Sequence, residues 1–265
     1  MVCRMIRITQ DMFQRTTIAF DQIYVLVLRD FKLKYNSTAL GFLWSLLVPI
    51  LQSAVYYVVF SSIARFGIRN YLLYMLSGMF LWYFFSGTVS MSLQSFLANT
   101  TLIKKTSFPR GLLVISRLTT ELLHFLLIIP VLIVVMLLYR ITPSWSFLTL
   151  PLVLAEFLVF TTGVCFLIAT LNIFCRDLER VVGVLLQAWF FMSPVFYQLD
   201  NVQDRLRGIL LFNPITCYLE AWRNIFYSPV VDFRPLLSGL LPALLMWIIG
   251  YGVFRLNRKR MAEAM

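Results

Sequence analysis

"NTTLIKKTSFPRG", residues 99–111, is a short basic segment between two long apolar runs of the chain. Its charged residues and its proline are Lys104, Lys105, Pro109 and Arg110. The runs on either side, 70–103 and 122–139, contain no Asp, Glu, Lys or Arg. A bilayer is crossed by an α-helix of roughly 20 apolar residues, so each run is close to or above the required length. The segment is therefore expected to be a loop between two membrane spans.

The composition of the whole chain is that of a polytopic membrane protein. Of its 265 residues, 60% are hydrophobic and only 13% are charged, which is too apolar for a soluble core with a solvated shell. The uncharged runs of membrane length are 35–64, 70–103, 122–139, 157–175, 181–199 and 235–254. We expect an all-α membrane protein with six transmembrane helices in one domain that covers residues 1–265.

Lysine and arginine are unevenly distributed between the two sets of loops that six spans define. Sixteen fall in the N-terminal segment, the 99–117 segment, the 176–180 turn and the C-terminal tail, and seven fall on the opposite side. Short basic loops remain in the cytoplasm, so both termini and the opening segment are expected there. The net charge of +11 then reflects topology and attraction to anionic membrane lipids. A nucleic-acid partner is not predicted, because it would need a soluble basic face.

The segments outside spans one to five, which occupy 35–199, have their own patterns. Residues 1–30 mix charges with apolar side chains, which favours an amphipathic helix in the cytoplasmic interface over a frayed tail or a removable signal peptide. Residues 200–234 are interrupted at Asn213-Pro214 and Ser228-Pro229, which indicates two short helices in a periplasmic, re-entrant hairpin. Span six, 235–254, and a cytoplasmic tail, 255–265, would complete the chain.

The sequence offers neither catalytic residues nor a metal or cofactor site. The four cysteines have no C-x-x-C spacing and no neighbouring histidine pair, which argues against a metal or redox centre. No G-x-x-x-x-G-K-[ST] motif occurs, so the chain cannot hold ATP in a P-loop by itself.

Four ionisable residues lie within or near the apolar runs. Arg117 and Glu121 are spaced to pair on one helix face, and His124 lies one turn further along; helix anchoring is favoured over a proton relay. Glu156 lies about 12 Å below the outer end of its span and should face protein or water. Whether it touches a substrate or bonds a neighbouring helix is left open by the sequence.

Four ordered stretches between residues 29 and 227 carry a family resemblance. They are "RDFKLKYNSTALGFLWSLLVPIL" (29–51), "LIKKTSFPRG" (102–111), "RDLERVVGVLLQAWFFMSPVFY" (176–197) and "LFNPITCYLEAWRNIFY" (211–227). The chain resembles the membrane permeases of ATP-binding-cassette exporters that move bacterial polysaccharides, including O-antigen, capsule and teichoic acid. It departs from the family pattern at Gly111 and Val114, where an acidic residue and a second proline are usual.

The resemblance implies an assembly and an activity. Two copies of this chain and two separate ATPase subunits would form an exporter in the bacterial inner membrane, and the ATPase subunits would bind ATP and magnesium. The substrate would be a lipid-linked polysaccharide, with O-antigen favoured and a teichoic-acid or capsule polymer as alternatives. The opening segment would be a coupling helix that docks into the ATPase, with Phe108 as its apolar anchor. The other coupling residues would be Lys104, Lys105, Pro109 and Arg110.

Aromatic residues form a second candidate site near the middle of two spans, and the hairpin forms a third. The first set is Trp82, Tyr83, Phe85, Trp189 and Phe190. Flat rings offer weak, repeated contacts to the C–H faces of sugars, so this set suits a substrate pathway, with helix packing as the alternative. The hairpin residues expected to form an outer gate are Asn213, Pro214, Glu220 and Trp222.

Functions from two other classes need features that this sequence offers only sparsely. A polytopic membrane glycosyl or phosphate transferase needs clustered Asp, Glu or His near one membrane surface, and this chain has scattered carboxylates and one His. An ion-coupled carrier needs essential intramembrane charges, for which Glu156 is the candidate.

Overall fold

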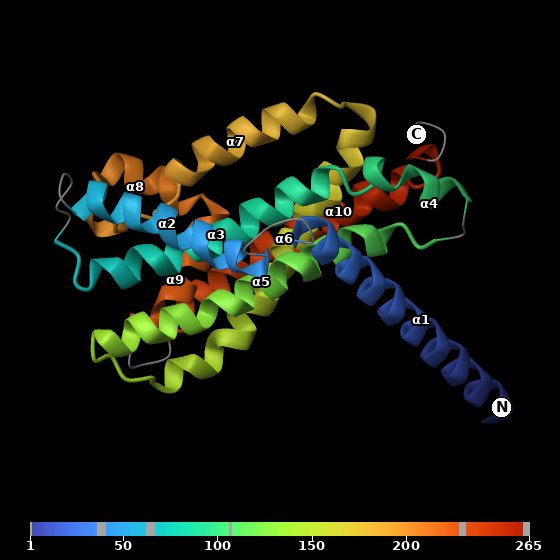
Figure 1. Cartoon of the computed structure of the whole chain (residues 1–265), viewed down its shortest axis with the longest axis horizontal. Helices are drawn as coiled ribbons and strands as arrows, with labels where there is room; N and C mark the ends of the chain where they lie inside the picture. The colour runs from blue at the N-terminus through green and yellow to red at the C-terminus, as the bar shows by residue number, and fades with distance from the viewer. Residues whose placement is uncertain (1, 36–40, 62–66, 106–107, 228–231, 262–265) are drawn as a thin grey trace.

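The structure of the chain is a computed structural model that is helical throughout its described residues (Figure 1). It describes residues 2–35, 41–61, 67–105, 108–227 and 232–261, and within them all side chains except those of residues 2–16, 35, 42, 45 and 105. The helices are α1 (Val2–Tyr35), α2 (Trp44–Val59), α3 (Tyr71–Leu93), α4 (Thr100–Lys105), α5 (Gly111–Leu138), α6 (Leu150–Phe174), α7 (Leu178–Met192), α8 (Asp204–Leu211), α9 (Pro214–Tyr227) and α10 (Arg234–Asn257).

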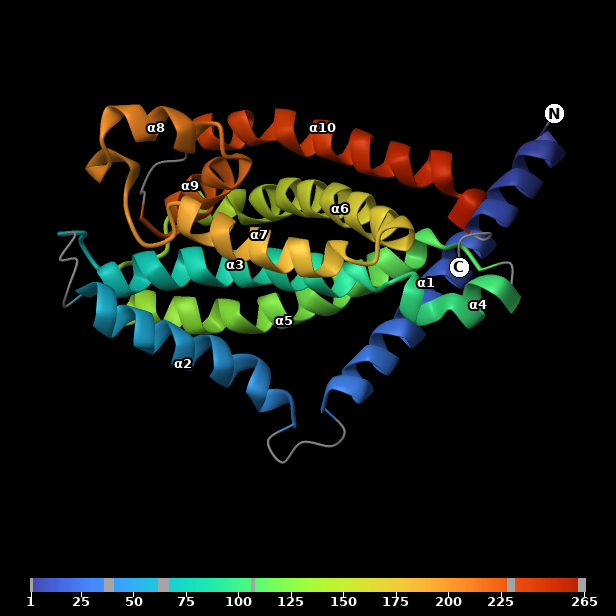
Figure 2. The same cartoon turned by 90° about the horizontal axis from the view of Figure 1, so that it is seen from above.

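Helix α3 is the centre of the bundle. Its sequence, YLLYMLSGMFLWYFFSGTVSMSL, is apolar on all sides, and such a helix is stable when other helices surround it. It contacts α2, α5, α6, α7 and α9, and in Figure 2 it runs between α5 and α7. Helices α2 and α10 lie on opposite sides of it in that view.

Helices α6 and α10 pack together more extensively than any other pair, and two glycines permit their close approach. A Cβ atom added at Gly163 would meet the backbone at Met246 and Trp247, and one added at Gly250 would meet the backbone at Gly163. Small residues at such a contact let two helix backbones approach closely, which is how helices associate when lipid surrounds them.

Four helical segments of the described chain are long and apolar enough to cross a membrane, compared with the six runs that the sequence indicates. They are α3, α5, α10 and the combined segment Trp145–Phe174, which contains α6. Helix α2 has 16 residues and α7 has 15, so each is shorter than its apolar run. The all-helical class is confirmed, and the six-span topology stays a prediction.

The bundle has two distinct ends, which we name by what lies there (Figures 1 and 2). Helix α4 and the last turns of α10 lie at one end, the α4 end, and α8 and α9 lie at the other, the hairpin end. Helix α1 packs against α5, and its N-terminal half runs away from the bundle (Figure 1). The helices on both sides of Asn213-Pro214 that the sequence indicates are present as α8 and α9.

Candidate functional site

The basic segment 99–111 contains a six-residue helix, α4, at the α4 end of the bundle. Lys104 and Pro109 are exposed, whereas Phe108 and Arg110 are half-buried. The Phe108 ring packs against the core of its own chain. The side chain of Lys105 lies outside the described residues. The segment therefore presents part of its predicted coupling surface, while Phe108 also contributes to packing within the chain.

Hydrogen bonds attach the start of this segment to α1, and the end of α3 that precedes it to α6. Arg29 Nη1 of α1 donates to Asn99 Oδ1 over 2.8 Å, and Asn172 Nδ2 of α6 donates to the carbonyl of Leu93 over 2.9 Å. Asn172 is almost fully buried, so this hydrogen bond takes the place of the bonds to water that its amide loses on burial. The end of α3 that leads into α4 is thereby fixed to two neighbouring helices.

Two further contacts attach Gln94, just before the segment, to α7 and Arg110, within it, to the residue after α10. Gln94 Nε2 donates to Glu179 Oε1 in the first turn of α7 over 2.8 Å. Arg110 Nη1 donates to the carbonyl of Arg258, just beyond α10. Partial burial, together with the positive charge of Arg258, lowers the pKa of Arg110 below its ordinary value. A displacement of segment 94–110 would therefore act on α1, α6, α7 and α10.

Asp30 of α1 is the centre of an ion-pair cluster at the same end. Its carboxylate lies 2.7 Å from Arg117 Nη1 of α5 and 3.1 Å from Arg29 Nη2. Asp30 is buried, and a buried carboxylate is stable only when cations or donors surround it. The cluster joins α1 to α5 next to the bond between Arg29 and Asn99.

The expected pairing of Arg117 with Glu121 is wrong. Arg117 pairs with Asp30, and Glu121 Oε1 instead lies 3.2 Å from Lys34 Nζ and 3.4 Å from His124 Nδ1. Gly87 of α3 faces this carboxylate, because a Cβ there would lie 3.1 Å from Glu121 Oε2. Which carboxylate each cation meets depends on where α1 crosses α5. The spacing of residues within α5 does not contain that information.

The predicted pathway aromatics of α3 and α7 meet in one buried cluster. The ring centroid of Trp82 lies 6.2 Å from that of Trp189 and 5.5 Å from that of Phe190, and Phe85 lies 5.4 Å from Trp189. Trp82 is 4% exposed and Phe85 is 0% exposed. Within a single chain these rings therefore pack against one another, with Trp189 at the partly exposed edge of the cluster.

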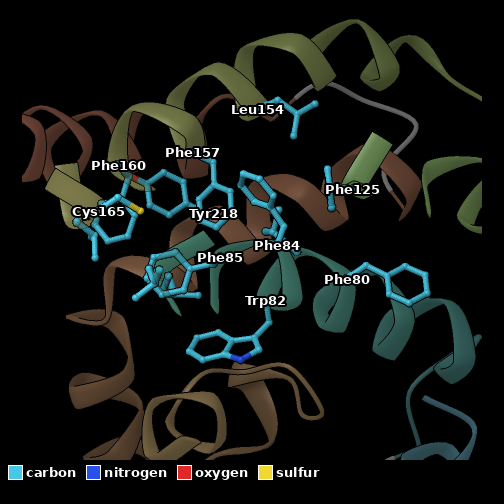
Figure 3. Close-up of a cluster of buried hydrophobic side chains, with 14 of the residues drawn as sticks. Phe80, Trp82, Phe84, Phe85, Phe125, Leu154, Phe157, Phe160, Cys165 and Tyr218 are labelled. Atoms are coloured by element: carbon cyan, nitrogen blue, oxygen red, sulfur yellow. The ribbon is translucent and has the colours of Figure 1, made fainter. Parts of the chain in front are cut away.

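Tyr83 does not join that cluster. It lines a separate cavity of about 480 Å³ between α2, α3 and α5. Figure 3 shows that neighbouring side chains of α3 diverge, with Trp82 on the opposite side from Phe84, which points toward Phe157 and Tyr218. The five predicted pathway residues thus have two different surroundings.

At the hairpin end, Asn213 connects the hairpin to the aromatic cluster. Its Oδ1 accepts from Trp189 Nε1 over 2.9 Å and from the backbone N–H of Ile215 over 3.0 Å. Its Nδ2 donates to Ser193 Oγ over 2.9 Å. Pro214 then begins α9, where its missing N–H costs no helical hydrogen bond. Asn213 of the predicted gate and Trp189 of the predicted pathway are therefore in direct contact.

The other two predicted gate residues face different surroundings. Trp222 is 0% exposed and packs between Phe125 and Phe226, with a centroid distance of 5.3 Å to each ring. Glu220 is half-buried and lines a polar cavity. Burial raises the pKa of the Glu220 carboxyl above its ordinary value, and the nearby charge of Arg223 acts in the opposite direction. Trp222 is a core residue of this chain, whereas Glu220 can meet a ligand.

Arg223, which sequence reasoning counted only as one cation of its loop, organises the hairpin end. It is 6% exposed, and its Nη1 donates to Tyr74 Oη over 2.7 Å and to the carbonyl of Pro194 over 2.6 Å. Its Nη2 donates to the carbonyl of Val195 over 2.7 Å, and its Cζ lies 3.6 Å from the centre of the Tyr74 ring. Arg223 therefore fixes the chain just after α7 to α3 and α9.

Glu156 of α6 is 7% exposed, and its Oε1 has no hydrogen-bond partner within the described residues. The carboxylate fits over Gly239 of α10, where a Cβ atom would collide with it and with the Tyr218 ring. Tyr218 itself donates to the Gly239 carbonyl over 2.8 Å. Glu156 faces protein, as expected.

Within the described residues there is no group of three or more His, Cys, Asp or Glu side chains that could hold a metal ion. The charged residues instead connect helices at the two ends of the bundle, with aromatic packing between them. Such an arrangement is suited to transmitting movement between the ends.

Comparisons with known proteins agree on one family. The family model described as "ABC-2 type transporter" matches residues 21–227. An O-antigen export system permease protein of Klebsiella pneumoniae is 34% identical over 245 residues, which cover 92% of this chain and 95% of that protein. One from Myxococcus xanthus is 31% identical over 264 residues, 98% of this chain and 100% of that protein. The polysialic acid transport protein of Escherichia coli is 22% identical over 249 residues, 90% of this chain and 94% of that protein.

Proposed function

We infer that this chain, which belongs to the ABC-2 type transporter family, is the membrane permease of an ATP-driven exporter that moves a lipid-linked polysaccharide out of the cytoplasm. O-antigen is the favoured substrate, because the O-antigen permeases match at 31% and 34% identity, compared with 22% for the polysialic acid transporter. A capsule or teichoic-acid polymer is the alternative. ATP and magnesium would be bound by a separate ATPase partner.

The observation that carries the mechanism is the attachment of the basic segment 99–111 to several helices at once. Asn99 at its start is bonded to α1, and Arg110 near its end is bonded to the carbonyl of Arg258 just beyond α10. Leu93 and Gln94, a few residues before the segment, are bonded to α6 and α7. We propose that α4 and the residues after it dock on the ATPase, so that closure of the ATPase dimer displaces this segment and, with it, the helices that it contacts. Exposed Lys104 would meet acidic groups of the partner, as would Lys105 and Arg110. Pro109 would fix the bend into α5.

The proposed topology has six crossings by α2, α3, α5, α6, α7 and α10 in the bacterial inner membrane. Both termini and α4 would lie in the cytoplasm, α1 would lie in the cytoplasmic interface, and α8 with α9 would form the re-entrant hairpin on the periplasmic side. The sixteen-to-seven distribution of Lys and Arg supports this orientation, since basic loops are retained in the cytoplasm. Helices α2 and α7 are short, so residues flanking them would complete their crossings.

We propose that two copies of this chain form the conduit between them, with two ATPase subunits below. The support is a row of exposed apolar side chains on α7, made up of Val181, Val184, Leu185, Phe191 and Met192. The aromatic cluster of Trp82, Phe85, Trp189 and Phe190 would support this wall from behind. Tyr83 would act through the separate cavity next to α2. The hairpin would close the outer exit, with Asn213 and Pro214 at its turn, Glu220 at its polar cavity and Trp222 in its core.

A carrier driven by an ion gradient is the second candidate, because Glu156 is buried and its Oε1 has no hydrogen-bond partner within the described residues. Export that stops in a Glu156→Gln variant and also stops when the ion gradient is dissipated, while cellular ATP is kept constant, would favour the carrier. Export that continues under both conditions would favour the ATP-driven permease.

The proposed function is tested by removing the gene and restoring it as variants, with surface polysaccharide, ATPase co-purification and ATP hydrolysis as readouts. Loss of the parent gene should abolish surface polysaccharide. Phe108→Ala should weaken ATPase association and uncouple hydrolysis from export, because a buried aromatic at an interface can contribute about 2 kcal/mol or more. Phe212→Ala is the matched control, since Phe212 is 91% exposed at the hairpin end.

The paired lysines give an independent measure of the same contact. Lys104→Ala alone should have little effect, whereas Lys104 and Lys105 changed together to Glu should weaken ATPase association in a salt-dependent way. A Phe108→Ala protein that binds the ATPase, supports hydrolysis and exports like the parent would reject the coupling role of this segment. Unchanged surface polysaccharide after removal of the gene would reject the export function itself.

A further inference from the structure

A polar cavity of about 390 Å³ lies beside Arg223 at the hairpin end. Its lining residues come from the start of α3, the connection between α7 and α8, both hairpin helices and the residues that begin α10. Segments far apart in the sequence thus converge on one concave surface. A cavity built from several fixed elements can hold a ligand in a defined orientation.

Three side chains of this cavity carry the hydrogen-bonding groups that matter for a ligand. They are Gln198, Glu220 and Asn224, and within the described part of the chain none of them makes a hydrogen bond. Two amides and a carboxyl offer acceptors and donors side by side. Each hydroxyl group of a sugar both donates and accepts hydrogen bonds. Two neighbouring hydroxyl groups can therefore bond to an amide and a carboxyl that lie side by side.

The base of the cavity is rigid and has one unsatisfied donor. Arg223 is held by its bonds to Tyr74 and to two backbone carbonyls, while its Nε, within the described residues, has no hydrogen-bond partner. Tyr227 is held by its bond to the Asn70 carbonyl over 3.0 Å, and its ring lies 6.3 Å from that of Tyr74. Fixed aromatic rings next to polar groups offer surface for the C–H face of a sugar ring.

The charge of the lining distinguishes between classes of sugar. Asp200, Glu220 and Asp232 contribute carboxylates, and Arg207 and Arg223 contribute guanidinium groups. Arg207 is already paired with Asp200 over 3.0 Å, and Arg223 is held by the chain's own carbonyls. Arg223 keeps its charge, so the carboxyl groups of Glu220 and Asp232 leave at most one negative charge in excess, which disfavours an anionic ligand. The donors and acceptors of Gln198 and Asn224 suit the hydroxyl groups of an uncharged one.

We propose that this cavity binds an uncharged sugar residue of the polysaccharide as the polymer leaves the permease. The proposal rests on the export function above and adds a binding site and a class of sugar to it. Gln198, Glu220 and Asn224 hold the hydroxyl groups, and the half-buried Tyr227 ring, supported by Tyr74 behind it, contacts the sugar face. Because only a few half-buried groups make the contacts, the polymer is held briefly and moves on.

Site-specific photocrosslinking in intact cells tests this with the cell's own polymer. A photoreactive amino acid replaces Asn224 in the full-length permease, which is expressed with its ATPase in cells that make the polysaccharide. The matched control places the same probe at Trp145, which is 77% exposed and lies outside the cavity. Irradiation should give a glycan-bearing ladder of the permease from position 224 and not from position 145. The ladder should vanish in cells unable to start polysaccharide synthesis.

Crosslinking shows only that the polymer comes near the cavity. A binding measurement with purified parent protein and a Gln198→Ala/Asn224→Ala variant tests whether these two side chains bind it. The probe is the oligosaccharide released by mild acid from the surface polysaccharide of the same strain, with oligosialic acid as the anionic comparison. The variant should bind the strain's oligosaccharide about tenfold more weakly than the parent, since two hydrogen bonds are lost. Oligosialic acid should bind the parent more weakly than the strain's oligosaccharide does.

The outcomes separate this proposal from the export function. If export requires the gene but position 224 gives no more crosslinking than position 145, or if the double variant binds like the parent, the cavity is not a sugar site. If the captured glycan is anionic, the assignment to uncharged sugars is overturned. If the polysaccharide reaches the surface without the gene, the export function itself fails.

Discussion

The two ends of the bundle hold their buried charges in different ways. At the α4 end, Asp30 pairs with Arg117 and Arg29, and Glu121 pairs with Lys34, so that side chain meets side chain between helices. At the hairpin end, Arg223 donates to the backbone carbonyls of Pro194 and Val195. A cation bound to carbonyls fixes the path of the main chain, whereas an ion pair fixes only two side chains.

This difference bears on which end of the bundle can rearrange more easily. Lys34 and Arg29 are 43% and 39% exposed at their side chains, so water can replace their partners at modest cost. Arg223 is buried, and water does not compensate its carbonyl partners when it is lost. The α4 end is therefore suited to rearranging, and the hairpin end is suited to staying intact.

The largest effect that the comparison predicts is that of Arg223→Ala. The substitution leaves the Pro194 and Val195 carbonyls and the Tyr74 hydroxyl without their donor in a buried site, which should lower the free energy of unfolding by about 3 kcal/mol or more. The measurement is thermal unfolding of the purified full-length protein in detergent. Arg207→Ala is the control, because Arg207 pairs with a carboxylate that is 80% exposed and should cost about 0–1 kcal/mol. Equal losses in the two variants would contradict the special role of Arg223.

Asp30→Asn should have the next largest effect, about 2–3 kcal/mol, because it leaves two cations near one another without a carboxylate. Arg117, whose side chain is 15% exposed, carries most of this cost. A double variant, Asp30→Leu with Arg117→Met, should recover much of the loss, since it replaces the buried pair with apolar contacts. Thermal unfolding of the three proteins makes the comparison. A double variant less stable than Asp30→Asn would show that the helices are joined by more than this pair.

Gly78→Ala tests whether the hairpin end depends on the position of the Arg223 side chain. A Cβ atom at Gly78 would lie 2.5 Å from Arg223 Nη2 and 3.3 Å from the Val195 carbonyl oxygen, so a loss of about 1–2 kcal/mol is expected from overpacking. In an Arg223→Ala background the same change should cost much less, because the colliding group is gone. Gly183→Ala, where a Cβ meets nothing within 4 Å, is the control. Equal costs of Gly78→Ala in both backgrounds would rule out the contact as the cause.

The sequence predicted those features of the fold that depend on local chemistry. Uncharged runs predicted where helices lie, and the Asn213-Pro214 step predicted the break between α8 and α9. The runs overestimated helix length, because apolar residues also occupy connections: the run 35–64 contains α2, which is only Trp44–Val59. Apolar composition reports the surroundings of a residue and not its backbone conformation.

The features that the sequence did not reveal depend on contacts between distant elements. Arg117 pairs with α1 because α1 crosses α5 there, which no spacing within α5 encodes. Arg223 could have been noticed, since it follows Leu219 by four residues and so falls on the apolar face of α9 with Ile215 and Phe226. A cation on an apolar helix face predicts a buried polar partner, although the identity of the partner needs the fold.

The smallest expected effect concerns the contact between Gln94 and Glu179. It joins the end of α3 to the first turn of α7 over 2.8 Å, and both side chains are exposed. Exposed contacts of this kind contribute about 0.5 kcal/mol or less, so Gln94→Ala and Glu179→Ala should each leave thermal unfolding nearly unchanged. The expected effect is on the coupling of ATP hydrolysis to export, because this bond lies between the segment proposed to face the ATPase and the helix proposed to line the conduit. Polysaccharide exported per ATP hydrolysed should fall in both variants, and the double variant should be no worse than either single one.

Gln203→Ala, an exposed change at the hairpin end, is the matched control for that ratio. A loss of stability approaching that of Arg223→Ala would mean that the α4 end is held as tightly as the hairpin end. An unchanged ratio would mean that movement reaches α7 by another route.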